Sequence, residues 1–279
     1  MMIMIAYFGL ITFIFGLVLG SFLNCTAMRI VKKENWVKGR SHCINCGHDL
    51  GAKDLIPLIS YLQTGGRCRY CKKKISIRYP LTELIFGFLS LFMYMAVMAP
   101  EIAKAFSGNN ELLFGSFLVF IRNIVLTGAL FVIALVDLEI QEVPNGCLIV
   151  GVLAFLLTTP FICEEDWIKW IGHRILAAIL TMMIIILIVV IMERVLKKQA
   201  MGGGDIKLYA LLALYLGYAG SYEVVLLSCI IGIIFVAVRK VLFPEKAKEF
   251  PFAPSIALAG YLMLIFSEIV TDWYFSLFI

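Results

Sequence analysis

Residues 175–222 contain the run ILAAILTMMIIILIVVIM (175–192), the connection ERVLKKQA (193–200), the segment MGGGDIK (201–207) and a second apolar run, LYALLALYLGYAGSY (208–222). Neither apolar run holds a charged side chain. Uncharged apolar runs of this kind are typical of helices that cross a membrane. This stretch therefore indicates a membrane protein in which a carboxylate, Asp205, stands at the start of a span.

The rest of the chain repeats this pattern. Of its 279 residues, 62% are hydrophobic and only 15% are charged, a composition that no single water-soluble domain could bury. We predict an all-α polytopic membrane protein with about eight transmembrane helices. It would comprise a first transmembrane anchor (1–28), a small polar module (29–79) and a seven-helix membrane domain (80–279). The expected spans are residues 1–28, 84–99, 117–136, 143–163, 175–192, 208–222, 224–238 and 252–267.

Half of the basic residues lie in one segment, since residues 29–78 hold 12 of the 24 Lys and Arg residues but only three acids. Loops rich in Lys and Arg beside a span remain in the cytoplasm, so we favour a cytoplasmic module over a nucleic-acid-binding surface. Alternating the spans from an outside N-terminus places Asp137 and Asp205 at the cytoplasmic ends of two spans. Arg122 lies roughly 22 Å along its helix from Asp137 and is expected to reach the outer surface.

Two Cys-x2-Cys pairs, separated by 21 residues, stand in the basic module. Four thiolates from two such turns can surround one Zn²⁺ tetrahedrally, which leaves no open position for a catalytic water. A segment of about 50 residues has too small a core to fold alone, so the metal would stabilise it. Four free thiols or a redox pair are the alternatives, and His42 and His48 are expected to remain exposed. The predicted ligands of this structural zinc are Cys43, Cys46, Cys68 and Cys71.

Asp137 and Asp205 are the acids that the predicted topology brings to one membrane depth. A charge inside a span costs about 2.5–3.5 kcal/mol on insertion scales, so such acids usually have a function or a partner. Two neighbouring carboxylates can share one proton, which provides the acid and the base for activating water against an amide. Glu139 and Glu142 face away from Asp137 on a helix and are expected to be solvated.

Three consecutive glycines precede Asp205. Because they lack a Cβ, they should permit unusual backbone conformations and the close approach of another chain, which would suit a peptide substrate. The alternative is a flexible turn in which Asp205 caps the next helix. Similarly, Glu83 opens the second span, where the helix dipole would favour an acid; its alternative is a contact with the basic module or with a cationic substrate.

These motifs together resemble those of bacterial type IV prepilin peptidases, bifunctional leader peptidase/N-methyltransferases with a GxGD-type intramembrane aspartic site. The similarity covers nearly the whole chain. In the first half it is carried by the paired cysteines, Gly20-Ser21-Phe22-Leu23-Asn24, Asp54-Leu55-Ile56-Pro57 and Arg78-Tyr79-Pro80-Leu81-Thr82-Glu83. In the second half it is carried by Asp137 with Pro144-Asn145, by Gly202-Gly203-Gly204-Asp205-Ile206-Lys207 and by Pro251-Phe252-Ala253-Pro254.

The resemblance implies that Asp137 and Asp205 are the catalytic pair of an aspartic endopeptidase in the bacterial inner membrane. Such enzymes remove the basic leader of type IV prepilins or pseudopilins on the cytoplasmic side, and many then methylate the new N-terminal residue with S-adenosylmethionine. No glycine-rich cofactor loop is visible, and Ser76-Ile77-Arg78-Tyr79-Pro80 lacks the glycine that relatives often carry before this motif. For that reason we name no residues that bind the methyl donor. The predicted cofactors are zinc and, from the resemblance, S-adenosylmethionine, and the predicted partners are prepilins and membrane lipid.

Two functions from other classes are compatible with parts of the sequence. A transporter could use Asp137 and Asp205 as proton or cation sites, because acids within spans often serve that role. It would leave the cysteine module without a function. A membrane-tethered zinc adaptor, in which the two acids are incidental, is the second alternative; its binding activity would survive Asp205→Asn.

Overall fold

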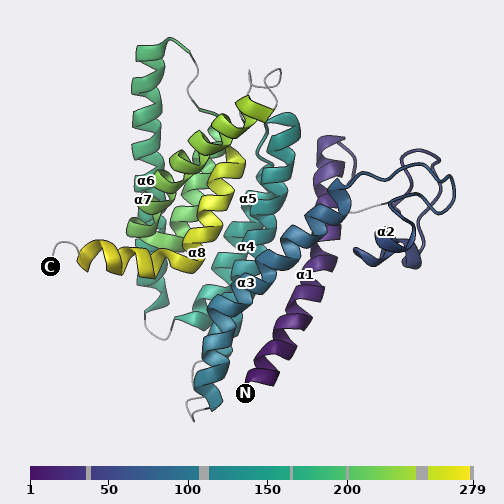
Figure 1. The fold of residues 1–279 in the computed structure, drawn as a ribbon. Coiled ribbons are helices and arrows are strands. Elements are labelled where there is room, and N and C mark those ends of the chain that lie inside the picture. Colours follow the sequence, from purple (N-terminus) through teal and green to yellow (C-terminus); the bar gives the residue numbers. More distant parts are fainter. Residues whose placement is uncertain (36–38, 107–112, 164–165, 199–200, 243–250, 277–279) are drawn as a thin grey trace. The chain divides into compact units, whose positions relative to one another are not determined.

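A computed structural model describes residues 1–35, 39–106, 113–163, 166–198, 201–242 and 251–276 (Figure 1). These residues form helices, turns and two isolated antiparallel bridges, so the predicted all-α class is confirmed. The elements in order are α1 (Met2–Val31), η1 (Ala52–Asp54), α2 (Ile59–Gln63), α3 (Arg78–Phe106), α4 (Leu113–Ile140), α5 (Asn145–Ile162), α6 (Trp167–Leu196), α7 (Gly203–Leu242) and α8 (Ala253–Ser276).

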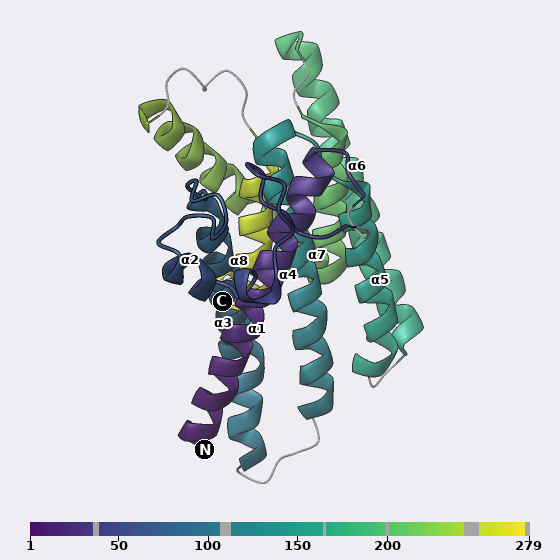
Figure 2. The same ribbon diagram turned by 90° about the vertical axis from the view of Figure 1, so that its right-hand side faces the viewer.

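Seven helices of the described chain are long and apolar enough to cross a membrane: α1 and α3 to α8. The predicted sixth and seventh spans both lie in α7, where the backbone leaves the helical conformation at Gly217 (φ 73°, ψ −160°). The break therefore falls inside the predicted sixth span, residues 208–222. Glycine readily adopts the left-handed φ that the break requires. Hydropathy does not reveal it, because the residues on both sides are apolar. Figure 2 shows the second, olive arm of α7 running in a different direction from the first.

The chain forms two compact units, Met1–Leu113 and Phe114–Ile279. The first unit contains the predicted anchor, the cysteine module and the second span, and the second unit contains α4 to α8. The expected three-part division at residues 28 and 79 stays a prediction.

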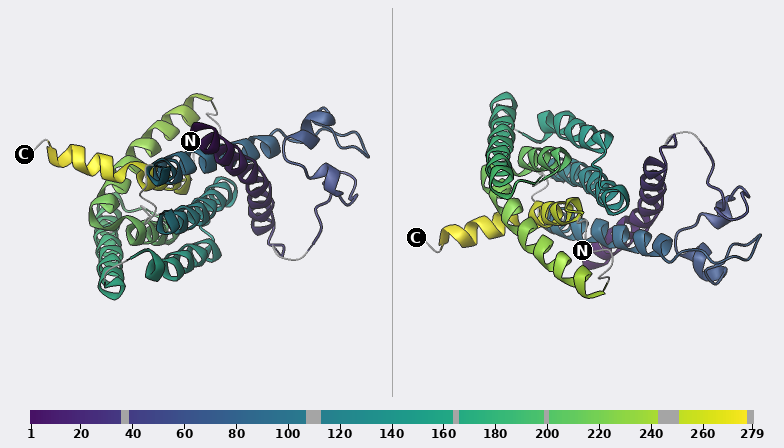
Figure 3. Two further views of the ribbon diagram at one scale, coloured as in Figure 1. Left: turned by 90° about the horizontal axis from the view of Figure 1, so that it is seen from below. Right: turned by 90° about the horizontal axis from the view of Figure 1, so that it is seen from above.

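In the first unit α1 packs antiparallel against α3 through small residues (Figure 3). A Cβ placed on Gly16 would lie 2.9 Å from the Cα of Gly87, and one on Gly20 would lie 3.0 Å from the Cα of Glu83. Small residues spaced four apart let two membrane helices approach closely, where dispersion contacts hold them together. The hydroxyl of Tyr94 also donates to the carbonyl of Ile5, at 3.0 Å.

In the second unit one apolar core is shared by all five helices. Large, fully buried side chains include Leu126 and Ile133 from α4, Phe155 from α5, Leu212 from α7 and Ile256 from α8. α6 buries only Ala177 and Ile185 and leaves most of its long apolar side chains uncovered. An apolar helix surface of this kind suits contact with lipid.

Arg122 departs from the sequence prediction. Its side chain does not reach the outer surface; instead the residue is buried in the second unit, with 9% of its surface exposed. The guanidinium lies 5.8 Å from the ring centre of Phe155 and 5.4 Å from that of Tyr215. Attraction between a cation and two aromatic faces favours this inward position, which hydropathy along a single helix cannot reveal.

Candidate active site and metal centre

The four predicted cysteine ligands converge in the first unit. The sulfur atoms of Cys43, Cys46, Cys68 and Cys71 all lie within 4.8 Å of one another, and those of Cys43 and Cys71 are 3.9 Å apart. Sulfur atoms bound about 2.3 Å from one tetrahedral zinc ion would be roughly 3.8 Å apart. The four thiols therefore fit a single metal ion with four sulfur ligands.

The two cysteine pairs adopt the same turn. The amide of Gly47 donates to the carbonyl of Cys43 at 2.8 Å, and the amide of Lys72 donates to that of Cys68 at 3.0 Å. Gly47 and Lys72 both have left-handed φ values, of 71° and 59°. Because a non-glycine residue is disfavoured there, Lys72 holds a strained conformation that the second turn must stabilise. One antiparallel bridge closes each turn, His42 with Asp49 and Arg67 with Lys74.

The electrostatic environment of the turns also suits a cation. Hydrogen bonds with the backbone at Asn45 and Cys46 lower the pKa of the Cys43 thiol to about 6. The backbone at His48 favours the Cys46 thiolate, but burial and the neighbouring thiols of Cys43 and Cys71 raise its pKa to about 11. A bound cation would remove this repulsion by neutralising the crowded thiolates.

Neither nearby histidine joins the sulfur cluster, as predicted. Both side chains are exposed. A ring nitrogen of His42 lies 3.4 Å from the carbonyl oxygen of Arg40, and the ring of His48 lies against that of Tyr70, with centres 3.6 Å apart and planes tilted by 36°. His48 therefore links the first cysteine turn to the second by an aromatic contact.

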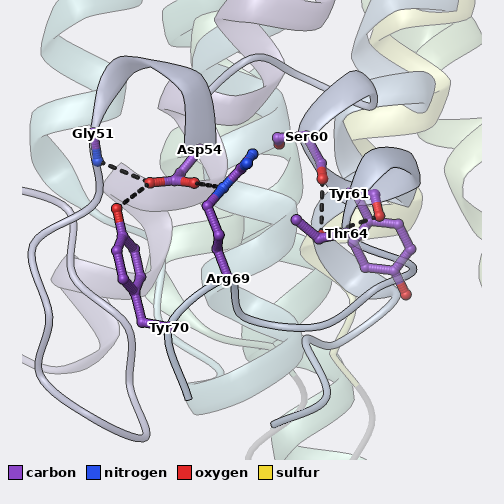
Figure 4. Close-up of polar contacts among 7 residues, drawn as sticks. All are labelled: Gly51, Asp54, Ser60, Tyr61, Thr64, Arg69 and Tyr70. Atoms are coloured by element: carbon purple, nitrogen blue, oxygen red, sulfur yellow. Dashed lines mark hydrogen bonds and ion pairs between the residues drawn. The ribbon is translucent and has the colours of Figure 1, made fainter. Parts of the chain in front are cut away.

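Asp54 ties the second cysteine turn to the segment before it, as Figure 4 shows. Its carboxylate accepts hydrogen bonds from the Gly51 amide (3.1 Å), from Nε of Arg69 (2.9 Å) and from the hydroxyl of Tyr70 (3.1 Å). Burial opposes the charged form, but these hydrogen bonds together hold the pKa of Asp54 below its usual value. In the sequence Asp54 stands out only as part of the motif Asp54-Leu55-Ile56-Pro57, because Arg69 and Tyr70, 15 and 16 residues away, leave no local signal.

Glu83 connects the cysteine module to α3. α3 begins at Arg78, so Glu83 lies in its second turn rather than at the N-terminus. The buried carboxylate accepts a hydrogen bond from the amide of Leu58 at 2.9 Å, and Leu58 has a left-handed φ of 59°. The structure therefore favours the predicted contact with the module over stabilisation by the helix dipole.

The second unit holds both Asp137, near the end of α4, and Asp205, at the start of α7. Asp137 lies three residues before the end of α4, is 5% exposed, and accepts a hydrogen bond at Oδ2 from the amide of Ala253 at 3.1 Å. Ala253 is the first residue of α8, and Asp205 is the third residue of α7. Both carboxylates thus lie where a helix begins and its free amides favour negative charge.

The glycines before Asp205 permit close packing and do not adopt an unusual backbone conformation. None of Gly202, Gly203 and Gly204 has a left-handed φ, so the backbone freedom that these glycines permit is not used in this structure. At Gly204 a segment of the same chain approaches closely, because a Cβ there would lie only 2.7 Å from Cβ of Val143; the close approach of a peptide substrate stays a prediction. Asp205 lies within the first turn of α7 and is not its N-cap.

A second contact holds the same two segments together. Nζ of Lys207 donates to Oδ1 of Asn145 at 3.1 Å, which joins α7 to the start of α5. The connection from α4 to α5 is therefore held against the start of α7. These are the segments next to Asp137 and Asp205. Glu139 and Glu142 are exposed, as predicted.

The chain is similar to known proteins over most of its length. The bacterial peptidase A24 N-terminal domain matches residues 14–97, and the type IV leader peptidase family matches residues 124–237. The prepilin leader peptidase/N-methyltransferase of Bacillus subtilis (strain 168) is 30% identical over 269 residues, which cover 96% of this chain and 98% of the relative. The protein of the same name from Aeromonas hydrophila is 29% identical over 302 residues, covering 98% and 95% of the two chains.

The type 4 prepilin-like proteins leader peptide-processing enzyme of Escherichia coli O78:H11 (strain H10407 / ETEC) is 27% identical over 285 residues, covering 90% of this chain and 93% of the relative. No solved structure matches the chain. Similarity to these relatives extends over nearly the full length of both partners, so it includes the cysteine module as well as the segments that carry the aspartates. The chain therefore belongs to the type IV prepilin leader peptidase/N-methyltransferase family, peptidase A24.

Proposed function

We propose that this chain removes the leader peptides of type IV prepilins by aspartic endopeptidase chemistry, with Asp137 and Asp205 as its catalytic pair. One observation carries the assignment of the residues: two acids from different helices, α4 and α7, lie in one unit, and the segments beside them are in contact, Gly204 with Val143 and Lys207 with Asn145. Family membership supports the reaction, since full-length relatives carry the name prepilin leader peptidase/N-methyltransferase.

In the proposed reaction the pair holds one proton between two carboxylates. The ionised carboxylate takes a proton from water as the water oxygen attacks the amide carbon, and the protonated carboxyl gives its proton to the leaving nitrogen. The products are a leader with a new carboxyl end and a pilin with a free amine. The Ala253 amide holds Oδ2 of Asp137 and so limits rotation of that carboxylate while water is activated.

The cysteine cluster is proposed to hold a structural zinc ion through Cys43, Cys46, Cys68 and Cys71. Sulfur ligands at all four positions of a tetrahedron would leave no place for a reacting water, so the ion would stabilise the module and take no part in cleavage.

Methylation of the new amine with S-adenosylmethionine is proposed from the names of the relatives. The positive-inside distribution of Lys and Arg supports a multi-pass protein of the inner membrane with the cysteine module and both aspartates on the cytoplasmic side. Prepilins or pseudopilins would be its substrates, and membrane lipid would surround its helices.

The test compares Asp137→Asn and Asp205→Asn with Glu139→Gln, an exposed acid two residues from Asp137. Purified variants in detergent are incubated with a prepilin and labelled S-adenosylmethionine, and loss of leader mass and gain of label are scored separately. Both Asn variants should lose cleavage while keeping the helical signal of the wild type, and Glu139→Gln should cleave normally. Appreciable cleavage by either Asn variant would show that the pair is not catalytic, and would also leave the transporter alternative open.

A further inference from the structure

Arg122 has more hydrogen-bonding capacity than the described residues use. It lies in α4, about 22 Å along the helix axis from Asp137, at ~1.5 Å per residue. With 9% of its surface exposed, its Nε and Nη1 atoms are buried and have no hydrogen-bond partner among the described residues. The faces of Phe155 and Tyr215 attract its charge but accept none of its protons in a directed hydrogen bond.

A second guanidinium reaches the same aromatic cluster from α6. Nη1 of Arg174 donates to the carbonyl of Tyr215 at 3.1 Å, and its guanidinium carbon lies 4.6 Å from the ring centre of Trp170. Tyr215 stands two residues before the break at Gly217, where helical carbonyls lose their usual partners. Arg174 therefore caps the end of the first arm of α7, and it remains partly exposed.

The two arginines have no ion pair with an acid in the described parts of the chain. Two cations thus converge on Tyr215 inside an apolar helical unit. An uncompensated charge in such surroundings is costly, and ionisable residues within membrane segments usually face a partner or a functional site. The missing complement is an anion with several acceptor oxygens, because both guanidinium groups are hydrogen-bond donors only.

We propose that Arg122 and Arg174 form a binding site for a phosphate group, supplied either by the headgroup of an anionic phospholipid or by free phosphate. Guanidinium groups match phosphate oxygens in charge and geometry, and the partly exposed Arg174 gives the ligand a route to the buried Arg122. The site lies well away from Asp137 along α4, so it is separate from the proposed cleavage reaction. Its ligand would link α4, α5, α6 and the broken α7.

The test uses the full-length protein, purified and stripped of lipid. Native mass spectrometry measures binding of phosphatidylglycerol and of a phosphate-free glycolipid with the same acyl chains; thermal unfolding measures stabilisation by inorganic phosphate. Wild type should prefer phosphatidylglycerol, and Arg122→Gln should weaken that binding roughly tenfold or more, since a charge-assisted hydrogen bond contributes about 1.5–3 kcal/mol. Arg194→Gln, an exposed arginine in the last turn of α6, is the matched control and should bind like the wild type. Stabilisation by inorganic phosphate that depends on Arg122 would identify the free ion as the source.

Equal binding of the two lipids by wild type, without stabilisation by inorganic phosphate, would overturn the proposal. Unchanged phosphatidylglycerol binding by Arg122→Gln, together with stabilisation by inorganic phosphate that does not depend on Arg122, would overturn it as well. If Arg122→Gln does not fold, Arg122→Lys replaces it: this variant keeps the charge but loses the planar donor set, and should bind phosphatidylglycerol less tightly than wild type. Glu164 and Glu165, which lie outside the described residues, provide the remaining check. If the double variant Glu164→Gln/Glu165→Gln destabilises the protein as much as Arg122→Gln does and neither phosphate source binds, the arginines are paired with the chain itself and the proposal fails.

Discussion

The contact between Gly204 and Val143 yields a sharp prediction for Gly204→Ala. The new methyl carbon would lie 2.7 Å from Cβ and 2.9 Å from Cγ2 of Val143, so close that the side chain of Val143 or the backbone of one of the two segments would have to move. Overpacking of this kind costs about 1–3 kcal/mol, and shifting a reacting group by about 1 Å can reduce a rate roughly a hundredfold. Because Gly204 precedes Asp205 directly, we expect a large loss of prepilin cleavage together with a modest loss of thermal stability.

Gly203→Ala is the matched control for this substitution. Gly203 is the neighbouring residue in the first turn of α7, has no left-handed φ, and would place its Cβ in open space. This variant should cleave at close to the wild-type rate. The rescue variant Gly204→Ala/Val143→Gly removes both contacting atoms and should recover part of the activity. Equal cleavage by Gly203→Ala and Gly204→Ala would refute the idea that close packing at Gly204 positions Asp205.

Three further outcomes are expected. Cys43→Ser should lower the zinc content per chain, measured by atomic emission, and the yield of folded protein; unchanged zinc stoichiometry would contradict the four-sulfur site. Folding lowers the pKa of Asp54, so the carboxylate stabilises the protein above about pH 4, and this stabilisation is lost as the pH falls through the pKa of the folded state. In denaturant titrations, the stability of Asp54→Asn should therefore depend less on acid pH than that of the wild type. Gly217→Ala should lower the midpoint of thermal unfolding, because a left-handed φ costs alanine about 1–2 kcal/mol and the new Cβ would lie 2.6 Å from Nη1 of Arg174. Gly172→Ala, whose Cβ would lie in open space, is the control and should not lower it. Equal midpoints for the two variants would exclude strain at the break.

Both the membrane class and the four-cysteine cluster could be predicted from sequence because their signals are local. Charge-free runs of about 20 residues can form only a small set of structures in lipid, and two Cys-x2-Cys turns bring sulfur atoms together over a few residues. The break at Gly217 was harder to place. Its neighbours are apolar on both sides, so hydropathy showed two spans but not the residue between them.

The partners of individual polar groups could not be predicted from sequence. The carboxylate of Asp137 accepts a hydrogen bond from the amide of Ala253, 116 residues later, and that of Glu83 accepts one from the amide of Leu58. Neither pair of partners is close enough in the sequence to leave a local signal. Arg122 was expected at the outer surface because a long charged side chain near a membrane boundary usually extends outward.

Composition and short-range spacing limit what the backbone can do, and so they already specify a helical membrane protein with four thiols in one module. The packing of the folded chain is needed to show which helix start binds Asp137, why Gly204 must be small and where the charge of Arg122 lies. These depend on contacts between segments far apart in the chain, where the competing packings have similar local energies and only the complete set of neighbours selects one.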